Sequence, residues 1–136
     1  MMKKTQESRE IFFFCDFHGH SIGRNVFMYG NQQTVPMHRL KEKIFPMMFS
    51  ENNENFSFED CSFIVHKSKE SCSRVVMWRE FNLINSYTCE SSFCGPTKGI
   101  YNNCHFNCIA YELIGRFFCK TLVDVTENKE RVKRVL

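Results

Sequence analysis

The ten residues from Ile11 to His20 read IFFFCDFHGH, and they decide how the rest of the chain is interpreted. A run of apolar residues from Ile11 to Asp16 predicts a strand buried on both faces, as in the middle of an α/β sheet. The run gives way to a polar cluster that contains His18 and His20. Because α/β proteins place their sites at the ends of such strands, this stretch predicts both a sheet and a functional site.

Three further segments have the composition of strands. Asn25–Tyr29 and Asn85–Ser91 are rich in strand formers, and Ser62–Val65 predicts a short strand. Side chains alternate across a strand, so the second segment separates into an apolar and a polar face. Its two faces consist of Tyr87 and Cys89 on one side, and Ser86, Thr88 and Glu90 on the other.

Helical spacing of apolar residues appears in three places. It predicts helices over Arg39–Phe49, Ser73–Phe81 and Phe106–Val125. Pro46 lies inside the first of these and is expected to break or kink it. Ser50–Asn55 reads as a polar loop. Strands alternating with helices predict an α/β fold with a mixed, mostly parallel sheet and flanking helices.

Length and composition exclude several classes of protein. The chain has 136 residues, 43% of them hydrophobic and 24% charged, which fits one globular domain. Its 15 Phe require a packed core. A net charge of +3 does not support nucleic-acid binding. No apolar run approaches the roughly 20 residues of a membrane helix, so we expect neither nucleic acid nor membrane as a partner.

The eight cysteines leave alternatives open. A secreted disulfide scaffold is one. These 136 residues contain no secretory signal segment, and Cys15, Cys89 and Cys119 lie in apolar stretches, so we expect reduced thiols inside a cell. A small cysteine-rich metal-binding module is another, based on Cys104-His105 and Cys108. No Cys-x-x-Cys pair supports it.

The polar residues around the strands allow more than one chemistry. His18, with Asp16 two residues earlier, suits a metal ligand and its supporting carboxylate, or a pair of ordinary satisfied side chains. Glu90, on a strand poor in charge, suits a general base or a structural ion pair. The basic residues of the segment before it form either a solvated face or a site for an acidic group. They are Lys67, Lys69, Arg74 and Arg79.

Taken together, these segments resemble the cytosolic carboxypeptidases, the tubulin-deglutamylating subfamily of zinc metallocarboxypeptidases. The resemblance runs over about residues 10–125, and the blocks agree in order and spacing. The matching blocks are Cys15–Ser21, Asn25–Gly30, Lys67–Glu70, Arg74–Arg79 and Ser86–Ser91. The resemblance implies a zinc-carboxypeptidase-like fold that is incomplete in this chain.

The resemblance also implies roles in catalysis. His18 corresponds to one ligand of the catalytic Zn²⁺. Asp16 and His20 are expected to hold that ligand in position. Glu90 corresponds to the general base and acid, which takes a proton from the attacking water and passes it to the leaving amine. We therefore expect an enzyme that hydrolyses peptide or isopeptide bonds.

Substrate recognition follows from the same resemblance. Arg74 is expected to bind the side-chain carboxylate of a terminal glutamate, with Lys69 and Arg79 attracting an acidic tail. The implied substrates are polyglutamylated proteins, tubulin above all, from which C-terminal or branched glutamates are removed. The implied location is the cytoplasm, with cilia, basal bodies or other microtubule structures as possible sites.

Departures from the family pattern bound these expectations. No His in the chain is followed three residues later by Glu, so the remaining zinc ligands are absent. We therefore expect residues 1–9 to be a flexible lead, 10–125 the C-terminal part of a catalytic domain that lacks its upstream half, and 126–136 a charged tail. The chain alone is expected to be inactive. The alternative is a truncated, non-catalytic protein that binds glutamylated tails or a partner.

Overall fold

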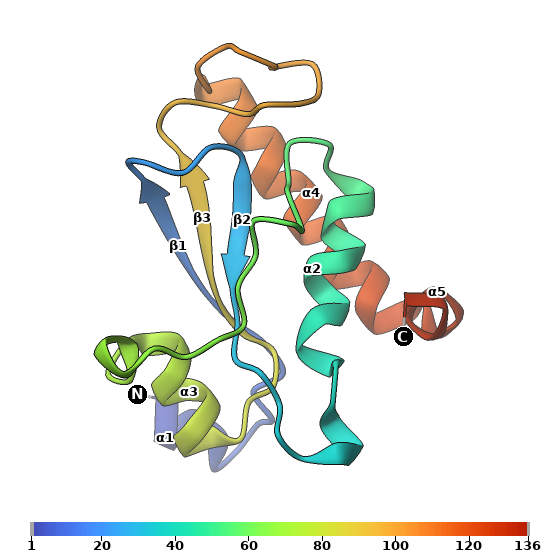
Figure 1. The fold of residues 1–136 in the computed structure, drawn as a ribbon. Helices are drawn as coiled ribbons and strands as arrows, with labels where there is room; N and C mark the ends of the chain where they lie inside the picture. Colours follow the sequence, from blue (N-terminus) through green and yellow to red (C-terminus); the bar gives the residue numbers. More distant parts are fainter. Residues whose placement is uncertain (1, 136) are drawn as a thin grey trace.

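The structure, a computed structural model, describes residues 2–135 as a three-stranded mixed sheet with helices packed on it (Figure 1). This confirms the predicted α/β class. The elements in chain order are α1 Met2–Gln6, β1 Phe14–His20, β2 Val26–Tyr29, α2 Lys41–Asn52, α3 Ser73–Phe81, β3 Ser86–Ser92, α4 Cys108–Glu127 and α5 Lys129–Val135, with short 3-10 helices at Pro36–His38 and Lys67–Lys69. No helix among the described residues is both long and apolar enough to span a membrane.

The strand order is β1-β3-β2, with β1 parallel and β2 antiparallel to β3. The expected central position of the first strand is therefore wrong, because β1 lies at an edge of the described sheet and begins at Phe14 rather than Ile11. Phe13, just before it, packs against Phe45 and Phe118 in an aromatic cluster. The apolar run thus reflects a contact with the helices rather than burial on both faces, and Phe17 remains 56% exposed.

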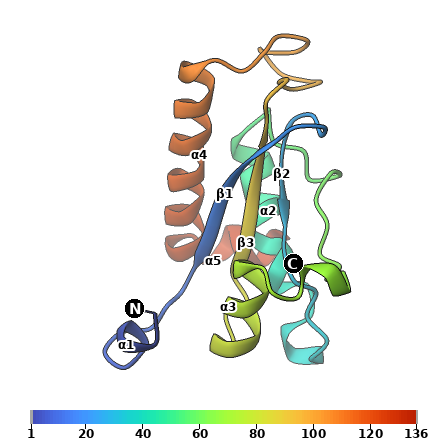
Figure 2. The ribbon, with the colours of Figure 1, turned by 90° about the vertical axis from the view of Figure 1, so that its left-hand side faces the viewer.

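One face of the sheet carries the hydrophobic core. Helices α2 and α4 both pack on it, as the two ribbon views show (Figures 1 and 2). The predicted alternation of β3 is confirmed, since Tyr87 and Cys89 point into this core while Thr88 and Glu90 lie on the opposite face. Phe118 of α4 has aromatic partners on both β1 and α2. The opposite face is left for polar side chains.

Helix α2 continues through Pro46, contrary to the expected break. Proline has no backbone N–H, so the carbonyl of Glu42, four residues earlier, loses its helical donor. The hydroxyl of Tyr87 replaces that donor, with 2.9 Å from its oxygen to the Glu42 carbonyl oxygen. The helix can therefore pass the proline without an unpaired buried carbonyl, and it extends to Asn52 into the expected polar loop.

The other predicted elements are largely confirmed. Helix α3 spans Ser73–Phe81 as expected, and α4 covers most of the predicted Phe106–Val125. The side chain of Asn107 caps α4 by accepting from the Ala110 N–H at 2.9 Å. Ser62 makes only an isolated bridge with Tyr29, so the expected strand there is not formed within the described residues.

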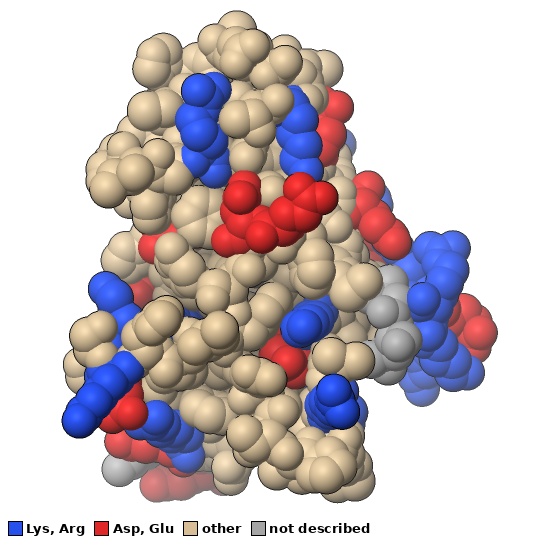
Figure 3. Space-filling view, viewed as in Figure 1, with Lys and Arg blue, Asp and Glu red and all other residues tan. Residues whose placement is uncertain are grey.

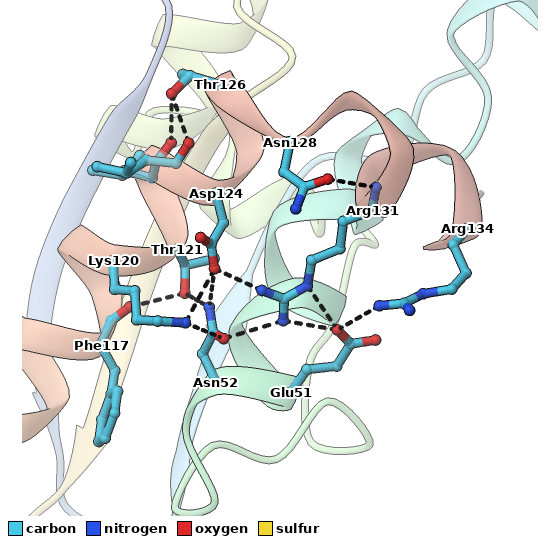
Figure 4. A network of polar contacts seen from close by, with 12 residues as sticks. Glu51, Asn52, Phe117, Lys120, Thr121, Asp124, Thr126, Asn128, Arg131 and Arg134 are labelled. Carbon is cyan, nitrogen blue, oxygen red and sulfur yellow. Dashed lines mark hydrogen bonds and ion pairs between the residues drawn. The ribbon is translucent and has the colours of Figure 1, made fainter.

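The residues near the C-terminus form helix α5, and most of them are exposed. Figure 3 shows that Lys and Arg gather around α5, which docks against the end of α2. Arg131 donates to both Asp124 of α4 and Glu51 of α2, and Asn52 joins the same network (Figure 4). The alternating charges at residues 126–136 thus include residues that tie three helices together, while the domain boundaries remain predictions.

Replacing Tyr87 by Phe tests the bond that compensates for Pro46. The change keeps the ring but leaves the buried Glu42 carbonyl without its donor. We expect Tyr87→Phe to lower the free energy of unfolding by about 1–3 kcal/mol in chemical denaturation. Tyr101→Phe, which removes a hydroxyl from a half-buried loop residue, is the matched control. Equal stability of the two variants would contradict the assignment.

The ion-pair network predicts a pH dependence. A hydrogen bond from Asn52, aided by Lys120 and Arg131, holds the pKa of Asp124 below its ordinary value. A carboxylate with a lowered folded-state pKa stabilises the fold above its unfolded pKa of about 3.9 and loses that effect as the pH falls further. The stability difference between the chain and Asp124→Asn should therefore shrink in acid denaturation series below about pH 4. Glu112→Gln, at an exposed position of α4, should show no such trend.

Candidate active site

The polar face of the sheet is hollowed into a cavity of about 640 Å³. All three strands, the segment between α2 and α3, and the start of α3 contribute to its wall. The lining residues are Asp16, His18, His20, Tyr29, Ser62, Ile64, His66, Lys69, Ser71, Cys72, Ser73, Arg74, Thr88 and Glu90. The cavity therefore brings together most of the residues that the sequence singled out.

His18 and Asp16 lie on the same face of β1 because they are two residues apart on a strand. The imidazole Nε2 of His18 is 3.1 Å from the carboxylate Oδ2 of Asp16. This contact orients the ring and leaves Nδ1, which has no hydrogen-bond partner among the described residues, available to a metal ion. The predicted partnership of these two residues is present in the structure.

Glu90 lies on β3 directly opposite His18, since the two residues pair in the parallel register. It is 9% exposed, and no hydrogen-bond donor or cation contacts its carboxylate within residues 2–135. The structural ion pair that the sequence left open is therefore absent from this part of the chain. A carboxylate held in a cavity without a fixed partner is open to contact by a bound water or substrate.

Arg74 supplies the positive charge of the cavity from the first turn of α3. Its guanidinium is 5.5 Å from the centre of the Tyr29 ring, and its Nε and NH1 contact the Gly30 carbonyl oxygen and the Cys72 sulfur at 3.4 and 3.2 Å. The residue is only 6% exposed, yet no carboxylate pairs with it in the described chain. Because a buried charge without a counterion is costly, the arrangement is suited to an incoming anion.

The remaining basic residues divide between two places. Lys69 lines the same cavity as Arg74, as the sequence predicts. Arg79 does not: it pairs with Glu70 at 3.3 Å, lies over the Trp78 ring, and faces a separate hollow. The structure therefore brings Lys69 into the site and leaves Arg79 outside its wall.

His20 serves the turn after β1 rather than the side chain of His18. Its Nδ1 accepts the backbone N–H groups of Gly23 and Ile22 at 2.7 and 3.3 Å, and its ring packs edge-on against Phe27. None of these contacts involves His18, so they do not show the expected support of a metal ligand by His20.

Tyr29 and His66 also line the cavity, although the sequence pattern did not single them out. Tyr29 could have been found from the strand register. Phe27 pairs with Glu90, and Tyr29, two residues later on β2, lies on the same face of the sheet. His66 lies in an irregular segment, where no periodicity indicates which way a side chain points.

The residues present do not by themselves fit a catalytic zinc ion. Such an ion requires three protein ligands and a water. No group of three His, Cys, Asp or Glu side chains within residues 2–135 is arranged to hold a metal. His18 offers one imidazole nitrogen, and the exposed Cys104 and Cys108 do not assemble into a metal site with His105.

Comparison with known proteins places these features in context. The chain is 46% identical over 126 residues to cytosolic carboxypeptidase 2 of Danio rerio and 46% over 125 residues to that of Mus musculus, covering 91% of this chain in both cases. It spans only 17% and 14% of those relatives. No protein-family model matches it. The sequence relatives confirm the resemblance read from the motifs.

Solved structures agree on the fold. A metallo-carboxypeptidase from Burkholderia cenocepacia superposes with a TM-score of 0.69 at 16% identity, over 92% of this chain and 33% of that one. A putative carboxypeptidase from Burkholderia mallei gives 0.66 at 15% identity, over 98% and 34%. At such identities the likeness concerns the fold alone, and the matched part makes up about a third of each neighbour.

The position of Tyr29 between opposite charges gives a test of the cavity. Burial raises the pKa of the Tyr29 phenol, Glu90 raises it further, and Arg74 lowers it. Glu90→Gln should therefore lower the Tyr29 pKa, and Arg74→Gln should raise it, in an NMR titration of the ring carbon that bears the hydroxyl. Glu80→Gln, on the exposed side of α3, is the control and should leave it unchanged. Shifts of the same sign in both cavity variants would contradict the geometry.

Proposed function

This chain is related to one segment of the cytosolic carboxypeptidases, and we propose that it forms part of the active site of a metal-dependent carboxypeptidase. The proposed reaction removes C-terminal or branched glutamates from polyglutamylated proteins such as tubulin. The observation that supports it best is the presence of an unpaired buried arginine and an unpaired buried carboxylate, Arg74 and Glu90, in one cavity.

Arg74 provides the recognition of an acidic side chain. A guanidinium forms two parallel hydrogen bonds with a carboxylate, and NH2 of Arg74 makes no hydrogen bond within residues 2–135. Lys69 at the rim adds a second positive charge that attracts acidic tails. A glutamate side chain bound here would neutralise the buried charge, so we expect the site to prefer glutamate to a neutral residue.

Glu90 provides the proton transfers. Its carboxylate takes a proton from the water that attacks the scissile carbonyl and then delivers it to the leaving amine. Its position in the cavity suits this task, because no donor within residues 2–135 occupies its oxygens. His18 opposite it is the proposed metal ligand of this chain.

The proposed Zn²⁺ requires ligands from outside these 136 residues, since the described chain holds no three-ligand group. The missing upstream half of the catalytic domain is therefore the first partner we propose. The relatives are named cytosolic carboxypeptidases, so we propose a cytoplasmic location, including cilia, basal bodies and other microtubule structures.

A second candidate function is binding without cleavage. The same lack of a three-ligand group favours it for this chain taken alone, because Arg74 and Lys69 can hold an acidic tail without any metal. The two candidates differ in whether glutamate is released, and they share the binding of carboxylates.

Carboxylate binding is tested with two arginine variants. A peptide ending in glutamates should bind the chain, and Arg74→Gln should weaken that binding by about 10–100-fold in a calorimetric titration, because a charge-assisted pair is lost. Arg79→Gln removes the same charge outside the cavity and should have little effect. If both variants lose affinity equally, recognition comes from net charge rather than from the pocket.

Catalysis is tested by supplying the rest of the domain. The purified chain should release no glutamate from polyglutamylated peptides. A chimera that carries this chain in place of the matching segment of Danio rerio cytosolic carboxypeptidase 2 should release it, and Glu90→Gln should then reduce kcat by about 10²–10⁴-fold.

Glu59→Gln, an exposed acidic position outside the cavity, is the control for the chimera. Glutamate release by the chain alone would overturn the requirement for outside ligands. An inactive but folded chimera that still binds the peptide would favour the non-catalytic candidate.

A further inference from the structure

Cys72 occupies an unusual position for a thiol. It is the residue before the first turn of α3 and it lines the cavity, half-buried, beside Arg74. Its sulfur accepts a hydrogen bond from NH1 of Arg74 at 3.2 Å.

The surroundings of the Cys72 sulfur are suited to anions. Arg74 is more than nine-tenths buried, has no carboxylate partner in the described chain, and has NH2 free of hydrogen bonds there. Lys69 lines the same wall, and the positive end of the α3 dipole lies at this point. An anionic reagent that reaches Cys72 therefore meets cations that hold it beside the sulfur.

The other half-buried or buried thiols lack this combination. Cys15 and Cys61 pack against the core, and burial raises the pKa of the Cys61 thiol to about 12. Cys89 lies on β3 and is buried in the core. Cys104 and Cys108 are exposed but lie outside the cavity and its basic wall.

We propose that Cys72 is a site of reversible modification by an anionic disulfide, glutathione disulfide being the chemical type, whose carboxylates bind Arg74 and Lys69. The thiol loses its proton to solvent and its sulfur attacks one sulfur of the disulfide. The original S–S bond breaks, a mixed disulfide forms on Cys72, and one glutathione leaves as a thiolate that takes up a proton. Cys72 is oxidised and the glutathione disulfide is reduced.

The adduct has a consequence for the cavity, and this part rests on the proposed function. Glutathione carries two carboxylates and is larger than a glutamate side chain, so on Cys72 it would fill the space in front of Arg74. The cavity would then be closed to a glutamate substrate until a thiol reductant removed the adduct. In a reducing compartment such a disulfide is transient and regulatory rather than structural.

Reagent charge provides the test on the folded chain. Labelling rates at each cysteine are measured by peptide mapping with an anionic and a cationic methanethiosulfonate. We expect the anionic-to-cationic rate ratio at Cys72 to exceed that at Cys104 and Cys108 by about tenfold, and to fall about threefold or more in Lys69→Gln, an exposed position. Glutathione disulfide should form its adduct at Cys72 before these reference sites.

Two results would overturn the proposal: equal charge ratios at Cys72 and the reference cysteines, or no reaction of Cys72 in the folded chain. Protection of Cys72 by L-glutamate addresses the proposed function separately. Charge-selective labelling without protection would leave the modification site standing and would remove the carboxylate pocket. Protection of Cys72 by L-glutamate without charge-selective labelling would support the carboxylate pocket and would overturn the modification site.

Discussion

The position of β3 between two partner strands is the constraint on which the rest of the structure depends. Hydrogen bonding to β1 and β2 holds the backbone of β3 in the extended conformation, so its side chains alternate between two faces of the sheet. Tyr87 and Cys89 then enter the core, and Tyr87 also stabilises the helix that contains Pro46. The same alternation presents Glu90 to the cavity. A shift by one residue would exchange the two faces and would destroy core and site together.

The charged residues at the helix ends and in the cavity fall into two groups, those paired with an opposite charge and those without such a partner among the described residues. At the helix ends, Arg131 is satisfied by carboxylates from α2 and α4, and this network contributes to stability. In the cavity, Arg74 and Glu90 are buried without counterions among the described residues. A buried charge without a counterion reduces stability, which is why we propose a role outside folding for these two residues. The contrast separates the charges that hold the fold from those proposed to bind.

The open edge of β1 connects the fold to the size of the chain. In the described sheet β1 has no partner strand on its outer side, and Phe17 of β1 is 56% exposed. Such an edge pairs readily with another strand or promotes aggregation. The solved neighbours are about three times longer than the part that this chain covers, and the sequence relatives are longer still. The solved neighbours therefore include further polypeptide beyond the part that matches this sheet.

The sequence by itself determined the α/β class, the bounds of α3, the two faces of β3 and the partnership of Asp16 with His18, because these depend on local periodicity and on residues two positions apart. Only the tertiary structure decided that β1 lies at an edge, that α2 continues through Pro46, and that Arg79 lies outside the cavity while Cys72 lines it. Each of these depends on contacts between segments far apart in the chain. The hydroxyl of Tyr87, for example, reaches a carbonyl 45 residues away, and no local pattern indicates such a bond.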